Sequence, residues 1–285
     1  MNRFNAYFCT FFITALSVLS TSANAIPTES RVPGGVALVP LVQNQDTNQP
    51  PKVTYGNRRV MVISSEGTKH AHVSPWVAVF GIPLSAKPEK RLVIKADGRE
   101  YPIAFDDKKY REQRLTIKNK KYVNPDPEQV ARWKREKAEM VAAYTHWSDT
   151  STPTFDFTLP AKGPFSSPFG LKRFYNNQPR SPHSGLDIAA PTGAPITAPS
   201  AGTVLAVGHY FFNGKTVILD HGQGLTTMYC HMDSIAVKVG DKIPHGGALG
   251  TIGKTGRVTG PHLHWGVSLN NVRVDPTLFV SELNQ

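Results

Sequence analysis

The chain has 285 residues, 23 glycines, 23 prolines and a formal net charge of +11. This length allows two domains of ordinary size, and the Gly-rich turns and Pro-rich joints favour β structure over helices. Only two cysteines are present, Cys9 and Cys230, so a small fold held together by several disulfides is excluded. The positive charge favours an anionic partner.

Residues 1–25 have the pattern of a cleaved signal peptide. Arg3 provides a positive start, FFITALSVLS an apolar core, and an Ala-Asn-Ala sequence ending at Ala25 a cleavage site, which predicts a mature chain from Ile26. The core is too short to span a bilayer as a mature helix. We therefore expect a periplasmic protein, with secretion or envelope association as the alternative. In that setting the anionic partners are wall or membrane-surface polymers and not nucleic acid, and Cys230 is expected to be buried without a disulfide.

Residues 26–122 are predicted to form an amino-terminal β domain with a leader. The leader, 26–55, contains at most one strand, VALVPLV. From 58 to 118, short apolar or alternating runs recur between turn sequences such as ADGRE and FDDKK, which is typical of a small β-sandwich or barrel. These runs are RVMVIS, WVAVFGI, RLVIKA, EYPIAF and RLTIK. His70 and His72 are expected in loops.

Residues 123–154 are predicted to connect the two domains through a single charged helix at about 126–146. Asp126, Pro127 and Gln129 suit the N-cap, first and third positions of such a helix. The sequence SDTSTPT that follows has the composition of a linker.

The carboxy-terminal domain, 155–285, is again rich in β patterns and glycine and holds most of the ten histidines. Three short sequences in it could build a metal site: HSGLD with His183 and Asp187, MYCHM with His231, and HLHW with His262 and His264. Two histidines and one carboxylate match the ligands of hydrolytic zinc sites, which keep a fourth position open for water. The remaining histidines could then transfer protons or stabilise an oxyanion. Residues i and i+2 of a strand share a face, so both HLHW imidazoles can reach one metal, and spacing alone leaves open which of them is the ligand.

Residues from about 160 to 280 resemble the LytM/lysostaphin-type zinc endopeptidases, which cut peptidoglycan cross-links. The matching stretches are SSPFG, HSGLDIAAPTGAPITAPSAGTV, VILDHGQGLTTMYCHM, VKVGDKIPHGGALGTIGKTG and GPHLHWGV. The resemblance implies a mostly β protein whose carboxy-terminal metallopeptidase domain is an antiparallel sheet with a groove across the metal. It implies one zinc ion per chain, held by His183, Asp187 and His264, with His231 and His262 as catalytic histidines. The implied substrate is the peptide stems of peptidoglycan, cleaved during cell-wall remodelling.

Two other functions fit parts of the sequence. Within the family, non-catalytic relatives activate a cell-wall amidase; these have typically lost metal ligands or catalytic histidines, whereas all five positions are occupied here. Outside it, APSAGTVLAVG and VKVGDKIPHGGALGTIG resemble the halves of biotinyl or lipoyl carrier domains, but the corresponding turn region, YCHMDS, lacks the lysine that bears the cofactor. The sequence leaves open which cross-link is cut, which catalytic histidine is the base, the oligomeric state, and whether the first domain or the helix covers part of the groove.

Overall fold

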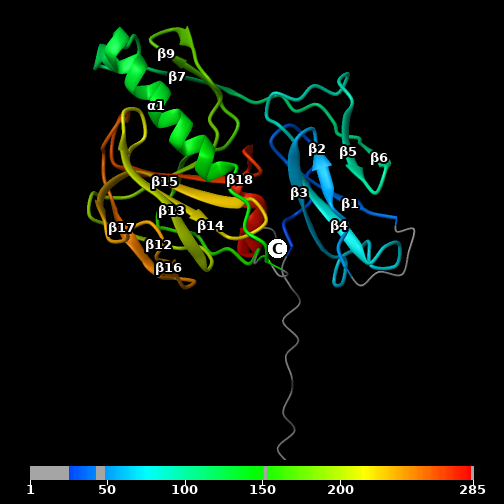
Figure 1. Ribbon diagram of the computed structural model, residues 1–285. Helices are drawn as coiled ribbons and strands as arrows, with labels where there is room; N and C mark the ends of the chain where they lie inside the picture. The colour runs from blue at the N-terminus through cyan, green and yellow to red at the C-terminus, as the bar shows by residue number, and fades with distance from the viewer. Residues whose placement is uncertain (1–25, 43–48, 151–152, 154, 284–285) are drawn as a thin grey trace, which may run out of the picture.

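The computed structural model describes residues 26–42, 49–150, 153 and 155–283 (Figure 1). This part of the chain is mostly β, with one α-helix and three short 3-10 helices, as the sequence predicts. The predicted signal peptide lies outside the described residues. None of the helices in the described part has both the length and the apolar character that spanning a bilayer requires.

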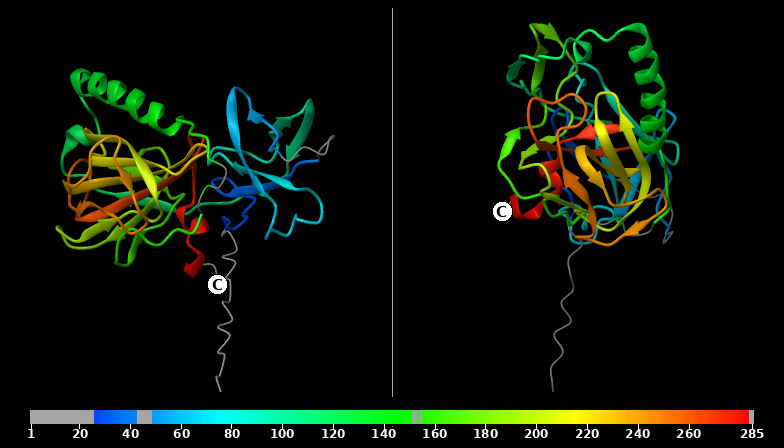
Figure 2. Two further views of the ribbon diagram at one scale, coloured as in Figure 1. Left: turned by 60° about the horizontal axis from the view of Figure 1, so that its bottom comes forward. Right: turned by 90° about the vertical axis from the view of Figure 1, so that its left-hand side faces the viewer.

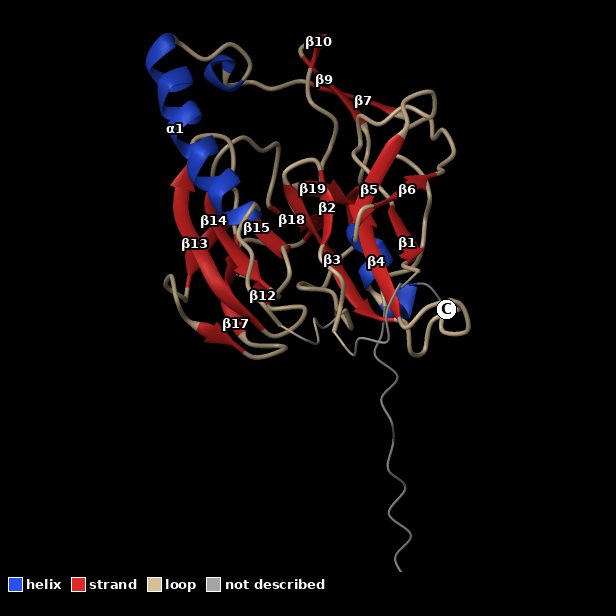
Figure 3. Ribbon diagram, turned by 45° about the vertical axis from the view of Figure 1, so that its right-hand side comes forward, coloured by secondary structure: helices blue, strands red, loops and turns tan. Residues whose placement is uncertain are grey.

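The amino-terminal strands form an antiparallel sheet that curls into an almost closed barrel (Figure 3). Its strands within the described residues are β1 (Val36–Pro40), β2 (Val53–Tyr55), β3 (Arg58–Ser64), β4 (Trp76–Gly81), β5 (Leu92–Ala96) and β6 (Arg99–Ile103). They pair in the order β1-β4-β3-β2-β5-β6, and the edge strands β1 and β6 approach each other. The predicted barrel-like domain is confirmed.

Where the barrel meets the rest of the molecule, both its inward-facing and its outward-facing side chains are buried. In β3, Val60 and Val62 point into the barrel, while Met61 and Ile63 point outwards. β1 and β4 follow the same period of two. The outward-facing residues belong to one apolar core with the second sheet, so the two sheets pack directly against each other, as the two lobes of Figure 2 show.

Two strands differ from the sequence prediction. β2 lies within 26–55, where the sequence predicts at most one strand, and three residues are too few to show a periodic pattern. β7 (Glu112–Leu115), expected in the amino-terminal domain, instead pairs in parallel with β9 (Lys172–Tyr175) of the second domain. With β10 (Gln178–Pro179) they form a small sheet in the order β10-β9-β7. A strand sequence does not identify its partner, so this pairing was not predictable from the run itself.

The carboxy-terminal sheet is antiparallel, as predicted, and carries the histidine-rich motifs. Its described strands are β8 (Phe165–Ser167), β11 (Leu186–Ala189), β12 (Pro195–Thr197), β13 (Gly202–Tyr210), β14 (Gly214–Asp220), β15 (Leu225–Ile235), β16 (Lys242–Ile243), β17 (Ala248–Ile252), β18 (His262–Leu269) and β19 (Val272–Val274). The main path is β16-β13-β14-β15-β18-β11-β8, with β12 on β17, β17 also on β15, and β19 on β18. The 3-10 helices η2 (Pro276–Phe279) and η3 (Ser281–Leu283) follow it.

The predicted helix is present as α1 (Pro127–Tyr144), preceded by the 3-10 helix η1 (Lys120–Tyr122). Its start has the predicted caps: Asp126 Oδ1 accepts from the Gln129 amide at 2.8 Å, and the Gln129 side chain accepts from the Asp126 amide at 3.3 Å. The helix lies on the carboxy-terminal lobe (Figure 2). Its last turn packs on β13, β14 and β15, where it covers Cys230. Cys230 is buried and free of disulfides, as predicted, and burial raises the pKa of its thiol to about 11.

His221, which follows the end of β14, is buried. Its Nδ1 donates to the Ala201 carbonyl oxygen over 2.7 Å, and its Nε2 lies 2.8 Å from Thr227 Oγ1. Burial lowers the pKa of His221 to about 4, against the opposing effects of the Ala201 contact and Asp220. By contrast, His209 on β13 is exposed.

We expect the folded protein to lose stability as the pH falls from 6.5 to 4 because of His221. The unfolded chain takes up this proton with a pKa of about 6.5, but the folded chain does so only near 4. The contribution is therefore complete above pH 6.5 and is lost below it, by about 2 kcal/mol between pH 7 and pH 5. Denaturant unfolding at both pH values measures this loss. His221→Gln should reduce the pH-dependent part by the same amount, and an unchanged pH dependence in that variant would contradict the assignment.

Candidate metal centre

The pairing of three neighbouring strands places the candidate residues on one face of the carboxy-terminal sheet. Asp187 on β11 lies directly opposite His264 on β18, and Ser167 on β8 lies opposite Asp187 on the other side. Directly opposite residues of an antiparallel pair project from the same face. His262 is two residues before His264 and therefore shares this face. The HSGLD and HLHW motifs thus meet across two adjacent strands.

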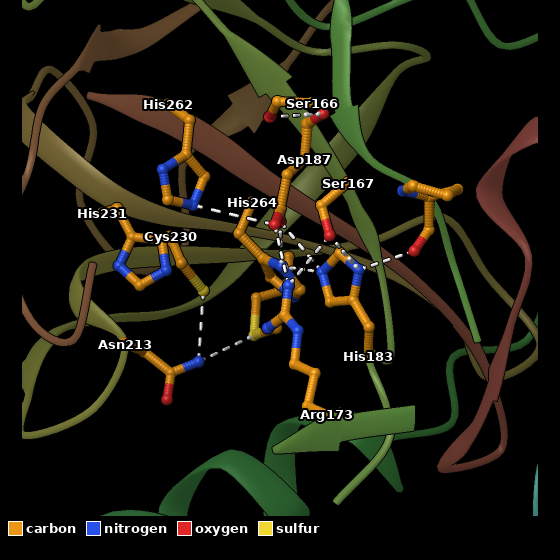
Figure 4. Close-up of polar contacts among 12 residues, drawn as sticks. Ser166, Ser167, Arg173, His183, Asp187, Asn213, Cys230, His231, His262 and His264 are labelled. Carbon is orange, nitrogen blue, oxygen red and sulfur yellow. Dashed lines mark hydrogen bonds and ion pairs between the residues drawn. The ribbon is translucent and has the colours of Figure 1, made fainter. Parts of the chain in front are cut away.

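His183, Asp187 and His264 converge in the structure (Figure 4). Oδ1 of Asp187 lies 2.9 Å from His183 Nε2 and 2.7 Å from His264 Nδ1, and the two nitrogens are 3.0 Å apart. All three residues are buried, and their ligand atoms lie within 4.8 Å of one another. The structure therefore brings together the three residues that the family resemblance implies as ligands.

The surroundings of His183 place a proton on its Nδ1. His183 Nδ1 lies 2.8 Å from the carbonyl oxygen of Pro168, which can only accept, so Nδ1 carries the proton of the neutral ring. Nε2 is then the nitrogen that faces Asp187 Oδ1 and His264 Nδ1. Such a convergence of imidazole nitrogens and a carboxylate oxygen is suited to a cation, and the Nδ1 contact is the outer contact that orients a ligating histidine.

An arginine that the sequence motifs do not single out holds the carboxylate from its other side. Arg173 on β9 donates from Nη2 to Asp187 Oδ2 over 2.9 Å. The same guanidinium donates to Gln113 Oε1 over 3.1 Å and to Ser167 Oγ over 3.2 Å. Gln113 belongs to β7, so the parallel pairing of β7 with β9 supports the orientation of Asp187.

His231 reaches the same face because of a bulge in β15. Tyr229 and Met232 both lie in the core, although residues three apart point to opposite faces of a regular strand. The pairing of β15 with β14 shifts register at this point, and His231 has a φ of +63°, in the left-handed region that is uncommon for residues with a side chain. The bulge lets Met232 take the core position and turns His231 towards the site, a known use of β-bulges.

His231 and His262 lie beside the three converging residues, with their ring centroids 4.9 Å apart. Nδ1 of His231 is 2.9 Å from the Thr255 carbonyl oxygen, and Nδ1 of His262 is 2.9 Å from that of Gly260. Each Nδ1 therefore carries the proton of the neutral ring, and each Nε2 is left with a lone pair. The Nε2 of His262 lies 3.9 Å from Asp187 Oδ2, so it faces the centre.

Burial and mutual contacts set the protonation of the centre. Burial alone would raise the pKa of Asp187, but its contacts with His183 and His264 outweigh burial and hold that pKa well below the usual range. Burial lowers the pKa of His264 to about 4, although Asp187 opposes the shift. Burial, together with His262 and His264, lowers the pKa of His231 well below its ordinary value. An ionised carboxylate and neutral imidazoles are the forms that ligate metals.

Gly185 makes room for His264. A Cβ at this position would lie 2.7 Å from Cε1 and 2.8 Å from Nε2 of His264, and 2.5 Å from the carbonyl oxygen of Trp265. Any side chain here would therefore displace the His264 ring or its strand. This close approach explains the glycine in the middle of HSGLD.

The centre opens into a groove of about 500 Å³, a volume typical of ligand sites. One wall is formed by η1, α1 and the segment between them, through Tyr122, Val123, Pro125, Val130 and Trp133. The helix and the residues before it therefore border the groove. None of the described lining residues belongs to the amino-terminal barrel.

Comparison with known proteins identifies the family. Residues 181–276 match peptidase family M23, and residues 29–107 match the M23 amino-terminal domain. A crystal structure from Pseudomonas aeruginosa assigned as a peptidase M23 is 42% identical, covers 88% of this chain and 94% of its own, and has a TM-score of 0.69. The chain belongs to peptidase family M23. The predicted family is confirmed.

Curated relatives of this M23 protein include enzymes of peptidoglycan. Peptidoglycan DD-endopeptidase ShyA of Vibrio cholerae is 37% identical over 110 residues, which are 38% of this chain and 26% of the relative. DD-carboxypeptidase/endopeptidase Mpg of Neisseria meningitidis is 35% identical over 111 residues, 39% of this chain and 26% of the relative. The M23 protein thus spans about a quarter of the length of these relatives.

Proposed function

We propose that this M23 protein is a zinc-dependent endopeptidase that hydrolyses peptide cross-links of peptidoglycan during cell-wall remodelling. The observation that carries the proposal is the convergence of His183, Asp187 and His264, with His231 and His262 beside them, at one groove. The names of the curated relatives support peptidoglycan as the substrate. The expected periplasmic setting favours a cross-link between D-alanine and diaminopimelate over a glycine bridge.

The three converging groups fit one zinc ion per chain. Tetrahedral zinc with bonds of about 2.0–2.1 Å places its ligand atoms roughly 3.3 Å apart, close to the separations of 2.7, 2.9 and 3.0 Å between the ligand atoms here. His183 would bind zinc through Nε2, His264 through Nδ1 and Asp187 through Oδ1. The other carboxylate oxygen of Asp187, Oδ2, would stay hydrogen-bonded to Arg173. When bound, zinc would lower the pKa of a coordinated water to about 7 and polarise a carbonyl group.

The two remaining histidines then act on protons. His231 and His262 each present an Nε2 lone pair to the centre, because their Nδ1 protons are held by carbonyl oxygens. One of them accepts the proton of the attacking water at Nε2 and later passes it to the leaving amine. The other takes up a proton from solvent at Nε2 and then donates a hydrogen bond to the tetrahedral oxyanion. Arg173 keeps Asp187 oriented throughout.

The alternative is a non-catalytic M23 protein that activates a cell-wall amidase. Such a protein has no need of a buried carboxylate facing two imidazoles, with two further imidazoles beside them. All five groups are present here and form one continuous cluster. This favours the enzyme.

We further propose that the mature protein works in the periplasm, where its positive charge attracts anionic wall or membrane-surface polymers. The signal-peptide pattern of residues 1–25 and the net charge of +11 support this location and these partners. Because mobile ions screen charges beyond about 8 Å at physiological ionic strength, added salt should weaken the attraction.

Mass spectrometry of defined muropeptide dimers tests the proposed function. We expect the zinc-loaded mature protein to convert cross-linked dimers into monomers. Removing the metal with a chelator should stop the reaction, and adding zinc back should restore it. Stoichiometric zinc without cleavage of any cross-linked dimer would instead favour the amidase activator.

A further inference from the structure

The groove carries three arginines and, among its described lining residues, no carboxylate. The arginines are Arg173, Arg180 and Arg257. Asp187 neutralises Arg173 through the 2.9 Å ion pair. Neither Arg180 nor Arg257 forms an ion pair with a carboxylate in the described part of the chain. The groove therefore holds two positive charges that the described protein does not balance.

Arg180 is positioned by neutral oxygens only. Its Nη2 donates to the Val123 carbonyl oxygen over 2.7 Å and to Gln178 Oε1 over 2.6 Å, and its Nη1 donates to the Pro179 carbonyl oxygen over 3.0 Å. These contacts fix the guanidinium in the groove wall without neutralising its charge.

Arg257 lies against two aromatic rings. Its guanidinium carbon is 4.7 Å from the ring centroid of Tyr175 and 4.4 Å from that of Phe212. The guanidinium makes one long hydrogen bond, from Nη1 to the Tyr122 carbonyl oxygen over 3.5 Å. The rings orient the planar group while most of its five N–H donors stay available for another partner.

Burial lowers the pKa of Arg257, and the neighbouring Arg173 and Arg180 lower it further, against the effect of Tyr175. An arginine keeps its proton at neutral pH even in such surroundings. An anion at this position would offset both the cost of burying the charge of Arg257 and the repulsion between the arginines.

On the basis of the proposed endopeptidase function, we propose that Arg257 and Arg180 bind a free carboxylate of the substrate next to the scissile amide. A guanidinium fork matches a carboxylate through two parallel hydrogen bonds. Arg257 shares the groove with His231 and His264, so the carboxylate belongs to a residue at the cut bond. The residue that supplies the scissile carbonyl has no free carboxylate at the bond, because its carboxyl group forms the amide. The free carboxylate must therefore belong to the residue that supplies the nitrogen, on the carbon bonded to that nitrogen.

Two groups in peptidoglycan carry a free carboxylate on the carbon bonded to the amide nitrogen. A cross-link to the side-chain amine of diaminopimelate carries a free carboxylate on the carbon attached to the amide nitrogen. The last residue of an uncross-linked stem carries the same arrangement. A glycine bridge cut at an internal bond has neither. The arginine pair would thus select against glycine bridges.

The experiment compares two muropeptide dimers that differ only in this group, carboxylate or carboxamide. We expect the zinc-loaded protein to show a KM about 10- to 100-fold lower for the carboxylate dimer, the usual effect of a hydrogen-bonded charge pair. Arg257→Met, which keeps the bulk and removes the charge, should abolish the preference and leave the zinc content unchanged. The matched control, Arg135→Met on the exposed surface of α1, should keep the preference. The same comparison with a stem peptide, free or amidated at its end, shows which of the two sources the pair recognises.

Equal KM values for the two dimers and for the two stem peptides would overturn the inference and leave the endopeptidase function intact. If the wild type cleaves none of them, the proposed function fails, and calorimetric titration of the zinc-free protein with the same dimers decides the inference. Tighter binding of the carboxylate dimer than of the carboxamide dimer, with the difference lost in Arg257→Met, supports the inference. Equal binding of the two dimers to the wild type overturns it. Should Arg257→Met unfold at a lower temperature, Arg257→Lys keeps a charge without the fork and should give an intermediate preference; a full preference in that variant would contradict bidentate binding.

Discussion

Replacing His264 with alanine should abolish both zinc retention and hydrolysis. The change leaves two ligands, His183 and Asp187, where a catalytic zinc site needs three. Loss of an outer contact to a ligand already costs about 10- to 100-fold in metal affinity, so loss of a ligand should exceed that range and turnover should fall with the zinc. Zinc per chain by atomic emission and cleavage of muropeptide dimers, on the same preparation, measure both effects.

The matched control for this variant is His209→Ala, because His209 is an exposed imidazole on β13 of the same sheet. It should leave zinc content and turnover at the wild-type level. A His264→Ala protein that keeps one zinc per chain and normal turnover would remove His264 from the ligand set.

Replacing His231 with alanine should separate the two effects: zinc is retained while turnover falls by about 10²- to 10⁴-fold, the range for loss of a general acid–base group. His231 has no contact with Asp187 or His183 among the described hydrogen bonds, so the ligand group stays in place. Its imidazole is held at Nδ1 by Thr255, which leaves Nε2 for the reaction. Steady-state kinetics with zinc measured alongside gives the result, and turnover near the wild-type value would exclude a catalytic role.

His231→Gly provides an internal control for the bulge. At a φ of +63°, alanine keeps the steric strain of a left-handed residue and glycine does not. The glycine variant should therefore have a free energy of unfolding about 1 kcal/mol higher than the alanine variant, while both lose the same turnover. Equal free energies of unfolding for the glycine and alanine variants would contradict the strained conformation. Different turnover in the two variants would mean that the backbone geometry at this position, and not the imidazole, limits the reaction.

The candidate ligand residues could be located because the motifs that hold them carry local information. HSGLD and HLHW lie on strands or at their ends, and a period of two places His262 and His264 on one face. The choice between those two could not come from spacing, since it depends on which residue of β18 lies opposite Asp187. In the structure that residue is His264, and its role as the ligand stays a prediction of the family resemblance.

Other parts of the centre depend on contacts that no local pattern records. Arg173 stabilises Asp187 only because β9 brings it across from another sheet, and Gln113 supports Arg173 only because β7 leaves the amino-terminal domain. His231 would point into the core in a regular strand, and a bulge reverses it. Histidine is one of the few residues besides glycine enriched at positive φ, but that tendency is too weak to locate a bulge in a sequence.

The packing between the two sheets limits what a shortened protein can reveal. Leu269, Val272 and Val274 share their apolar surroundings with outward-facing residues of β1, β3 and β4. A truncation that removed the first 122 residues would uncover this hydrophobic surface and would also take away β7, and with it Gln113. An inactive fragment would then reflect a damaged scaffold, so it would say nothing about whether the missing segment regulates the enzyme.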